Sequence, residues 1–338
     1  MNAIAYVSET HAVRGALLRL QANLAQDTLS HGWPRGVIGA YGPDHEIQYG
    51  YPEIAGYWLR WASQSAEVSA ACGAAVVAWL EARGDEAEGW PTRVSPLSRP
   101  LHATYHQAQY LFDHCMLWDG LQRWGQVRGD VRAAGLAAEV WRHLQTFAQA
   151  SGQGSLALLA GRGAVPRRWS GRVGPFLLKV CARVNGQQGP LAEACAQATP
   201  ELIAQALAAP HAQAHPQLYA IEGMLELGYA DEACDALGAL IEAHGGLLGL
   251  RESASHGPMR CDVLAQALRA AHLCGLAGRL GADMESLALN LAQRVDSRGR
   301  VPFAQGHEAA AFPTWAALFT EQALRAWLGQ PLEAKDIV

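Results

Sequence analysis

Four carboxylates stand near the starts of four separate helical segments, each after a long loop. They are Glu53, Asp113, Glu222 and Asp262. Cleavage of a glycosidic bond needs two carboxyl groups about 5–10 Å apart, one of them acting as the acid. Lyase or epimerase chemistry instead needs a base beside a sugar C–H and a group that polarises the neighbouring carbonyl or carboxylate. If the four segments converge, these carboxylates are the candidate catalytic residues.

Aromatic, cationic and amide side chains occur at or near these helix starts and at two further ones, and they suit a sugar ligand. The candidate substrate-binding residues are Tyr51, Tyr57, His106, Arg172, Tyr219, Arg260, Gln266 and Trp315. Aromatic rings offer flat faces to sugar rings, and arginine makes paired hydrogen bonds to a carboxylate. A saccharide that contains a uronic acid would fit such a set.

Each carboxylate also has a structural interpretation. Glu53 and Asp262 fall in first helical turns, where the helix dipole favours a negative charge, and Asp113 could be a helix cap. Glu222 lies past the first turn among apolar residues, where an unpaired charge would cost several kcal/mol. Glu222 therefore either faces a wet cleft near the mouth of the fold or is a buried acid paired with Arg260.

Helical periodicity recurs along the whole chain, whereas strand signals are scarce. Apolar residues at three- and four-residue steps predict amphipathic helices. We expect twelve of them, near residues 12–25, 54–64, 66–83, 109–124, 130–149, 172–185, 189–208, 215–228, 231–244, 259–275, 282–295 and 313–328. Short links alternate with long loops rich in Gly, Pro, Arg and aromatic residues, which indicates a repeated pair of helices.

The two members of each pair differ in composition. The segments after long loops carry aromatic and ionisable residues, whereas their partners are plain amphipathic helices rich in Ala. We therefore predict one all-α domain over residues 1–338, an (α/α)6 toroid with six inner helices, six outer helices and the long loops at its mouth. The first helix would close the ring against the last. An open α-solenoid is the alternative, because stacked repeats do not force closure.

Composition limits the partners and cofactors of the chain. Half of its 338 residues are hydrophobic, which is ample for a globular core. A net charge of −5 gives no electrostatic footprint for nucleic acid, and no apolar run is long enough to span a membrane. No zinc-like set of Cys, His and Asp appears, so we expect neither a metal nor a cofactor. Because no signal peptide is evident, we expect a cytoplasmic protein, of open oligomeric state.

Four segments together resemble the VpsJ-type proteins of bacterial exopolysaccharide gene clusters. They are "YPEIAGY", "HPQLYAIEG", "RCDVLAQALR" and "PTWAALFTEQAL", and they cover about four of the six repeats. The resemblance implies a six-hairpin fold and a polysaccharide context.

The segment "HPQLYAIEG" also resembles the inner-helix motif of N-acylglucosamine 2-epimerase-like enzymes. In that motif an Asn-Pro start leads to a His and then to a Glu; Pro216 and Glu222 match it. Tyr219 stands where those enzymes have an acid/base histidine, and their terminal His-bearing motif is not evident in "PTWAALFTEQALRAW".

The leading functional prediction is a carbohydrate-active enzyme that acts on an oligo- or polysaccharide by glycoside hydrolase or lyase chemistry. A sugar epimerase or isomerase is the second prediction, and a non-catalytic glycan-binding or assembly protein is the third. A close carboxylate pair in the cleft favours hydrolysis. Arg with Tyr or His and no such pair favours a lyase or epimerase, and a cleft filled by side chains favours the third prediction.

Overall fold

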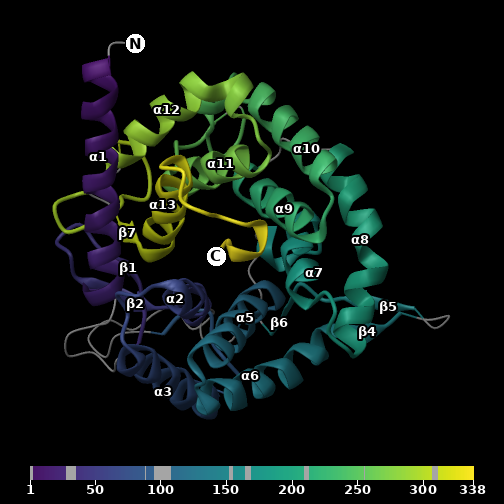
Figure 1. The fold of residues 1–338 in the computed structure, drawn as a ribbon. Coiled ribbons are helices and arrows are strands. Elements are labelled where there is room, and N and C mark those ends of the chain that lie inside the picture. Colours follow the sequence, from purple (N-terminus) through teal and green to yellow (C-terminus); the bar gives the residue numbers. More distant parts are fainter. Residues whose placement is uncertain are drawn as a thin grey trace.

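The helices form two concentric rings (Figure 1). The computed structural model describes residues 3–27, 36–87, 89–94, 108–151, 155–163, 169–208, 213–254, 256–306 and 311–338. The inner ring contains α2 (Pro52–Gln64), α5 (Leu111–Arg128), α7 (Leu178–Val184), α9 (Ala214–Leu227), α11 (Cys261–Leu273) and α13 (Thr314–Trp327). The outer ring contains α1 (Ala3–Ala22), α3 (Ala70–Ala87), α6 (Val131–Leu144), α8 (Pro190–Ala208), α10 (Ala230–Ala243) and α12 (Ala277–Gln293).

Burial distinguishes the two rings. The inner helix α11 is buried at every residue from Cys261 to Ala271. The outer helix α6 buries one stripe of residues, namely Ala133, Leu136, Ala137, Val140 and Leu144. A helix buried on all sides belongs to a core, whereas one with a single apolar stripe faces solvent. No helix in the described ranges is long and apolar enough to cross a membrane.

The ring is closed. Each inner helix contacts the next, α13 contacts α2, and α1 packs against α12 and α13. Gln21 Nε2 on α1 donates to Glu321 Oε1 on α13 at 2.9 Å, and Arg19 Nε donates to the main-chain oxygen of Asp296 at 3.1 Å. The predicted (α/α)6 toroid is therefore confirmed, and the open solenoid is not the architecture.

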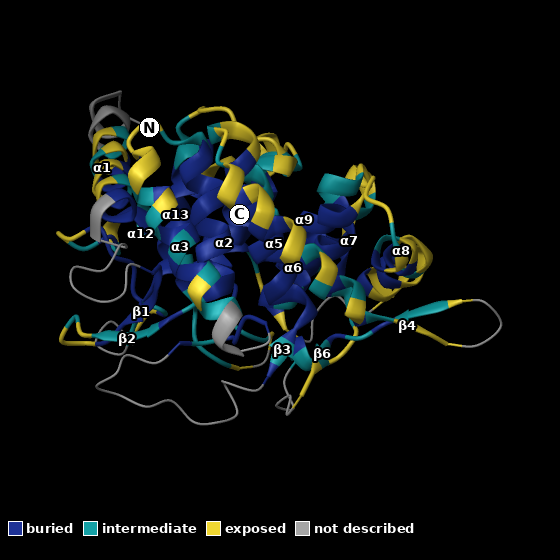
Figure 2. Cartoon of the chain, turned by 90° about the horizontal axis from the view of Figure 1, so that it is seen from below, coloured by how far each residue is buried: buried dark blue, intermediate teal, exposed yellow. Residues whose placement is uncertain are grey.

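Short strands gather at one end of the rings (Figure 2). They form a three-stranded antiparallel sheet of order β2-β1-β7 and two two-stranded sheets. The strands are β1 (Ile38–Tyr41), β2 (Ile47–Gly50), β3 (Gln109–Tyr110), β4 (Ala148–Ala150), β5 (Leu156–Leu158), β6 (Gly161–Arg162) and β7 (Phe312–Pro313). Because β2, β3 and β7 lead into α2, α5 and α13, their pairing fixes where these inner helices begin.

Short helical turns complete the described elements. They are the π-helical turn Asn23–Asp27 and the 3-10 turns Gln145–Phe147, Trp169–Gly171, Pro175–Leu177, Leu247–Gly249 and Ala334–Asp336. One of them corrects a predicted boundary: the helix expected from residue 172 begins only with the 3-10 turn at Pro175, which continues into α7 at Leu178. Proline is well suited to the first position of a helix, and Gly174 before it is extended.

Two glycines allow α2 and α5 to cross closely. A Cβ at Gly56 would overlap the main-chain oxygen of Met116, and a Cβ at Gly120 would overlap that of Gly56. Because the main chain cannot move aside as a side chain can, we expect Gly56→Ala to lower the free energy of unfolding by about 1–3 kcal/mol. Chemical denaturation measures the change. Gly135→Ala, on an exposed face with open space around it, is the control, and equal stability of the two variants would contradict the close crossing.

Candidate active site

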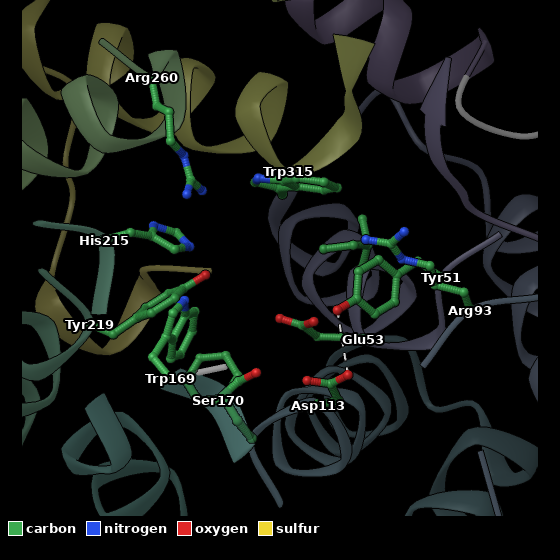
Figure 3. A pocket seen from close by; sticks show the side chains of 12 residues that line it. Tyr51, Glu53, Arg93, Asp113, Trp169, Ser170, His215, Tyr219, Arg260 and Trp315 are labelled. Carbon is green, nitrogen blue, oxygen red and sulfur yellow. Dashed lines mark hydrogen bonds between the residues drawn. The ribbon is translucent and has the colours of Figure 1, made fainter. Parts of the chain in front are cut away.

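A cavity of about 230 Å³ lies at the strand end of the inner ring (Figure 3). Six of the residues predicted from the sequence line it, namely Tyr51, Glu53, Asp113, Tyr219, Arg260 and Trp315. The other lining residues are Ile54, Arg93, Phe112, Trp169, Ser170 and His215. The starts of α2, α5, α9 and α13 therefore meet at one site, as a closed ring requires.

One wall of the cavity carries two carboxyl groups. Glu53 lies in the first turn of α2, and Asp113 lies in the first turn of α5. Figure 3 shows both on the same side of the cavity, beside Tyr51. The hydroxyl of Tyr51 donates to Asp113 Oδ2 at 3.4 Å. Since the N-terminus of a helix favours negative charge, both positions suit a carboxylate.

The facing wall carries an imidazole and a phenol from α9, the third inner helix from α2 in either direction. His215 and Tyr219 are four residues apart and share a helix face, with ring centroids 4.6 Å apart. Burial lowers the pKa of His215 to about 4, and the charge of Arg260 acts in the same direction. The imidazole is therefore neutral at pH 7.

Asp262 lies behind the wall and holds two wall residues in place. Arg260 donates from Nε to Asp262 Oδ1 at 3.0 Å and from Nη2 to Oδ2 at 2.6 Å, and Trp315 Nε1 donates to Oδ2 at 2.8 Å. Asp262 is fully buried and does not line the cavity. Burial alone would raise its pKa, but Arg260 and other partners lower it to about 2. Asp262 is thus an ionised anchor.

Tyr57 does not line the cavity, but it contacts Tyr219, which does. Its hydroxyl donates across the ring axis to the hydroxyl of Tyr219 at 3.4 Å, and its ring contacts Phe319. Burial raises the pKa of both tyrosines well above the usual value, so both remain protonated. The ammonium of Lys179 lies 5.5 Å and 5.0 Å from the ring centroids of Tyr57 and Tyr219. Tyr57 and Tyr219 together form a layer that we call the floor, and Tyr57 is not part of the cavity wall predicted from the sequence.

Glu222 lies beneath this floor, seven residues and about 10 Å along α9 from His215. Its side chain is 1% exposed, and it does not line the cavity. Lys179 Nζ donates to Glu222 Oε2 at 2.7 Å, while Arg269 donates to Oε1 from Nε at 2.8 Å and from Nη2 at 2.6 Å. Burial alone would raise the pKa of Glu222, but these two cations lower it. Its partners are thus Lys179 and Arg269, and not Arg260.

Three other predicted residues lie elsewhere. Gln266 is fully buried between His215 and Glu222. Arg172 lines a neighbouring cavity of about 490 Å³ that shares Trp169 with the first. It lies there because the helix begins at Pro175 and leaves residue 172 in the preceding turn. His106 is outside the described residues.

Arg93 is a lining residue that the sequence did not reveal. It comes from the loop after α3, next to Val94, which bridges to Gly50 at the end of β2. Its guanidinium lies 4.2 Å from the ring centroid of Tyr49, within the range of a cation–π contact. No periodic pattern marks a loop arginine, and only the pairing of distant segments brings it to the cavity.

The groups that meet at the cavity are acid–base and hydrogen-bonding groups. Figure 3 shows the carboxyl groups on one side with Tyr51 and Arg93, and the neutral imidazole on the other side with Tyr219 and Arg260. Within the described ranges, no three His, Cys, Asp or Glu side chains are grouped to hold a metal ion. The arrangement can accept and return protons while it binds hydroxyl or carbonyl oxygens of a ligand.

No protein-family model and no curated protein matches the chain. Solved structures match nearly all of it. A D-mannose isomerase has a TM-score of 0.68 at 12% identity over 94% of this chain and 97% of its own. A sugar epimerase from a ruminal bacterium has a TM-score of 0.63 at 10% identity over 94% and 100%. A glycosidase variant in complex with glucose has a TM-score of 0.60 at 11% identity over 98% and 100%.

At 10–12% sequence identity, the similarity to these structures shows a shared fold. The chain has the six-hairpin toroid that occurs in a mannose isomerase, a sugar epimerase and glycosidases. These matches do not show the VpsJ-type resemblance, so the polysaccharide context that it implies stays a prediction.

Proposed function

We propose that this chain is a sugar isomerase or epimerase that moves a proton at the carbon next to the carbonyl of an open-chain sugar. The observation that carries the proposal is the opposition of a neutral imidazole, His215, to the carboxyl group of Glu53 across one cavity. The likeness in fold to a D-mannose isomerase and a sugar epimerase supports it. A sugar epimerase or isomerase was the second functional prediction from the sequence, and it is now our leading proposal.

The proposed reaction begins when His215 accepts the proton on C2. The C–H electron pair forms a double bond between C1 and C2, and the carbonyl electron pair moves onto O1. The hydroxyl of Tyr219 can donate to that oxygen, because it accepts from Tyr57 and keeps its own hydrogen available. A donor placed where negative charge develops lowers the barrier to the enediolate.

Two outcomes follow from the enediolate. If His215 returns its proton to C1 while the proton on O2 moves to O1, the product is the ketose. If Glu53 is protonated and delivers a proton to C2 from the opposite face, the product is the C2 epimer. His215 then keeps the first proton, and both groups exchange protons with water before the next turnover. Groups on two facing walls favour epimerisation, since delivery must occur on the face opposite to removal.

The size of the cavity favours a small substrate. Pockets for drug-sized ligands hold about 300–1,000 Å³, and this cavity is about 230 Å³. We therefore propose one sugar unit, either a free monosaccharide or the reducing end of a short chain. An exopolysaccharide context with uronic acids is kept as a prediction that rests on sequence motifs alone.

Hydrolysis of a terminal glycosidic bond is the second candidate. Glu53 and Asp113 enter the same cavity from neighbouring helices, which is the residue set that hydrolysis requires. One carboxyl group would protonate the glycosidic oxygen, and the other would activate water or attack the anomeric carbon. This candidate retains the leading prediction from the sequence.

A product screen separates the candidates. The purified protein is incubated with free hexoses, N-acylhexosamines and uronic acids, and separately with oligosaccharides that contain them. Chromatography should reveal the conversion of a free sugar to its isomer or epimer. Release of a terminal sugar without conversion of any free sugar would support hydrolysis instead. No change in either set would contradict both candidates and favour a glycan-binding protein.

The buried imidazole predicts the acid limb of the pH profile. A base acts only when it is unprotonated. For isomerisation, in which His215 alone moves the proton, kcat/KM should therefore stay constant down to about pH 5 and fall tenfold per unit below about pH 4. An acid limb near the ordinary histidine pKa of 6.5 would contradict His215 as the base. Folding needs a parallel check by circular dichroism. Since the unfolded chain takes up this proton first, stability itself falls as the pH drops from 6.5 to about 4.

A further inference from the structure

We propose that Gln266 and Glu222 fix the tautomer of His215, so that Nε2 carries the lone pair that accepts the proton. The inference rests on the function proposed above for the reaction it serves. It gives two buried residues a positioning role. Glu222 then acts through Gln266 and His215 and does not touch the sugar.

A continuous row of hydrogen bonds carries the inference. His215 Nδ1 lies 2.7 Å from Gln266 Oε1. Gln266 Nε2 lies 3.4 Å from Glu222 Oε1. The carboxylate is held in turn by Arg269 and Lys179, whose bonds to it measure 2.6 to 2.8 Å. Every member of the row is buried.

The charge of Glu222 determines which way the Gln266 amide points. An ionised carboxylate only accepts hydrogen bonds, so the NH₂ group of Gln266 must face it. The reverse orientation would place the amide oxygen against a carboxylate oxygen without a proton between them. Such a contact leaves two buried acceptors without a donor and is strongly unfavourable. Gln266 Oε1 is therefore held toward His215.

The amide oxygen in turn determines the tautomer of the imidazole. A carbonyl oxygen only accepts, so Nδ1 of His215 must carry the hydrogen that joins it to Gln266. The imidazole is neutral near pH 7, and a neutral imidazole has one protonated nitrogen. Nε2 is then the basic nitrogen, on a ring that lines the cavity.

The buried cations keep the Gln266 amide in one orientation. If Glu222 were protonated, its O–H could donate to the Gln266 oxygen, and the amide could turn over. Lys179 and Arg269 favour the ionised form through direct ion pairs of 2.7 Å and 2.6 Å. The main-chain oxygen of Val338 accepts from both cations and supplies part of their remaining hydrogen bonding. The cluster below the floor therefore has a role in the chemistry above it.

Nitrogen NMR of ¹⁵N-histidine-labelled protein tests the tautomer without any substrate. In the wild type near pH 7, His215 should show a protonated, pyrrole-type Nδ1 and an unprotonated, pyridine-type Nε2. The signals are assigned by their loss in His215→Asn. In Gln266→Leu, Nδ1 loses its acceptor, and the ring should shift to the Nε2–H form or to a mixture. A wild-type His215 with the hydrogen on Nε2 overturns the proposal.

Gln322→Leu is the matched control for lost stability. Gln322 is also a fully buried glutamine: it accepts from Arg269 Nη1 at 2.8 Å, and its other hydrogen bonds go to the main chain of Asp336 and Val338. The Gln322→Leu variant should be less stable than the wild type but should keep the same His215 tautomer. An equal tautomer shift in both variants would refute a specific role for Gln266.

Once a sugar that the enzyme converts is known, Gln266→Leu should lower kcat about 10²–10⁴-fold with little change in KM. If the wild type shows the Nδ1–H signal but converts no sugar in the product screen, the hydrogen-bond row is supported and the proposed function is rejected. Failure of the tautomer proposal and failure of the proposed function are therefore distinguishable.

Discussion

His215→Asn is expected to lower kcat/KM for sugar conversion by about 10²–10⁴-fold, the usual contribution of a general base. Asparagine can still donate to Gln266 Oε1, the partner that lies 2.7 Å from the histidine. It cannot accept a proton near pH 7. The effect should therefore appear in kcat, since the wall remains in place and the other lining residues still bind the sugar.

The matched control is His11→Asn, on an exposed position of the outer helix α1. Its activity and melting temperature should equal those of the wild type. Circular dichroism of His215→Asn should show an intact fold, so that lost activity reports chemistry. A fully active His215→Asn enzyme would exclude His215 as the base and leave the carboxyl pair Glu53 and Asp113 as the remaining catalytic groups.

Glu222→Gln is expected to produce the largest loss of stability, about 3–5 kcal/mol. The amide keeps the size of the side chain but removes the charge that pairs with Lys179 and Arg269. Both cations are fully buried, with side chains 1% and 0% exposed, so neither can reach water. Thermal unfolding should show a melting temperature lower by roughly 4–7 °C.

A second variant tests the cause of that loss. Lys179→Met combined with Glu222→Gln removes one stranded cation along with the carboxylate, so part of the stability should return. If Glu222 were instead the catalytic acid or base, Glu222→Gln would abolish turnover at an unchanged melting temperature. That result would contradict the structural role of the buried cluster.

The fold could be predicted from the sequence because its signals are local. Apolar spacing revealed each inner helix, as in the expected segment 54–64 and the observed Pro52–Gln64. The alternation of short and long loops then indicated which helices pair. Polar residues of first helical turns, such as Glu53 and Asp113, also line the cavity as predicted. They do so because a closed ring brings the starts of all inner helices to one end.

The depth of a residue along the axis could not be predicted in the same way. Periodicity gives the face of a helix, and Glu222 does face the axis. The floor depends on a contact between Tyr57 and Tyr219, which are 162 residues apart in sequence. That contact separates Glu222 from the cavity. The partner of Glu222 was missed for a similar reason, since Arg269, and not Arg260, lies at the matching depth of α11.

Deuterium incorporation from solvent measures proton transfer at carbon itself. A sugar that the enzyme converts is incubated with it in D₂O, and proton NMR follows the hydrogen on C2. Abstraction by His215 and delivery by Glu53 predict that the C2 epimer formed by the wild type carries solvent deuterium at C2, and that His215→Asn forms no labelled epimer. A ketose acquires deuterium at C1 only to the extent that the imidazolium exchanges with water before it returns the proton. An epimer without deuterium at C2, or deuterium uptake that is equal in the two proteins, would contradict proton transfer by His215.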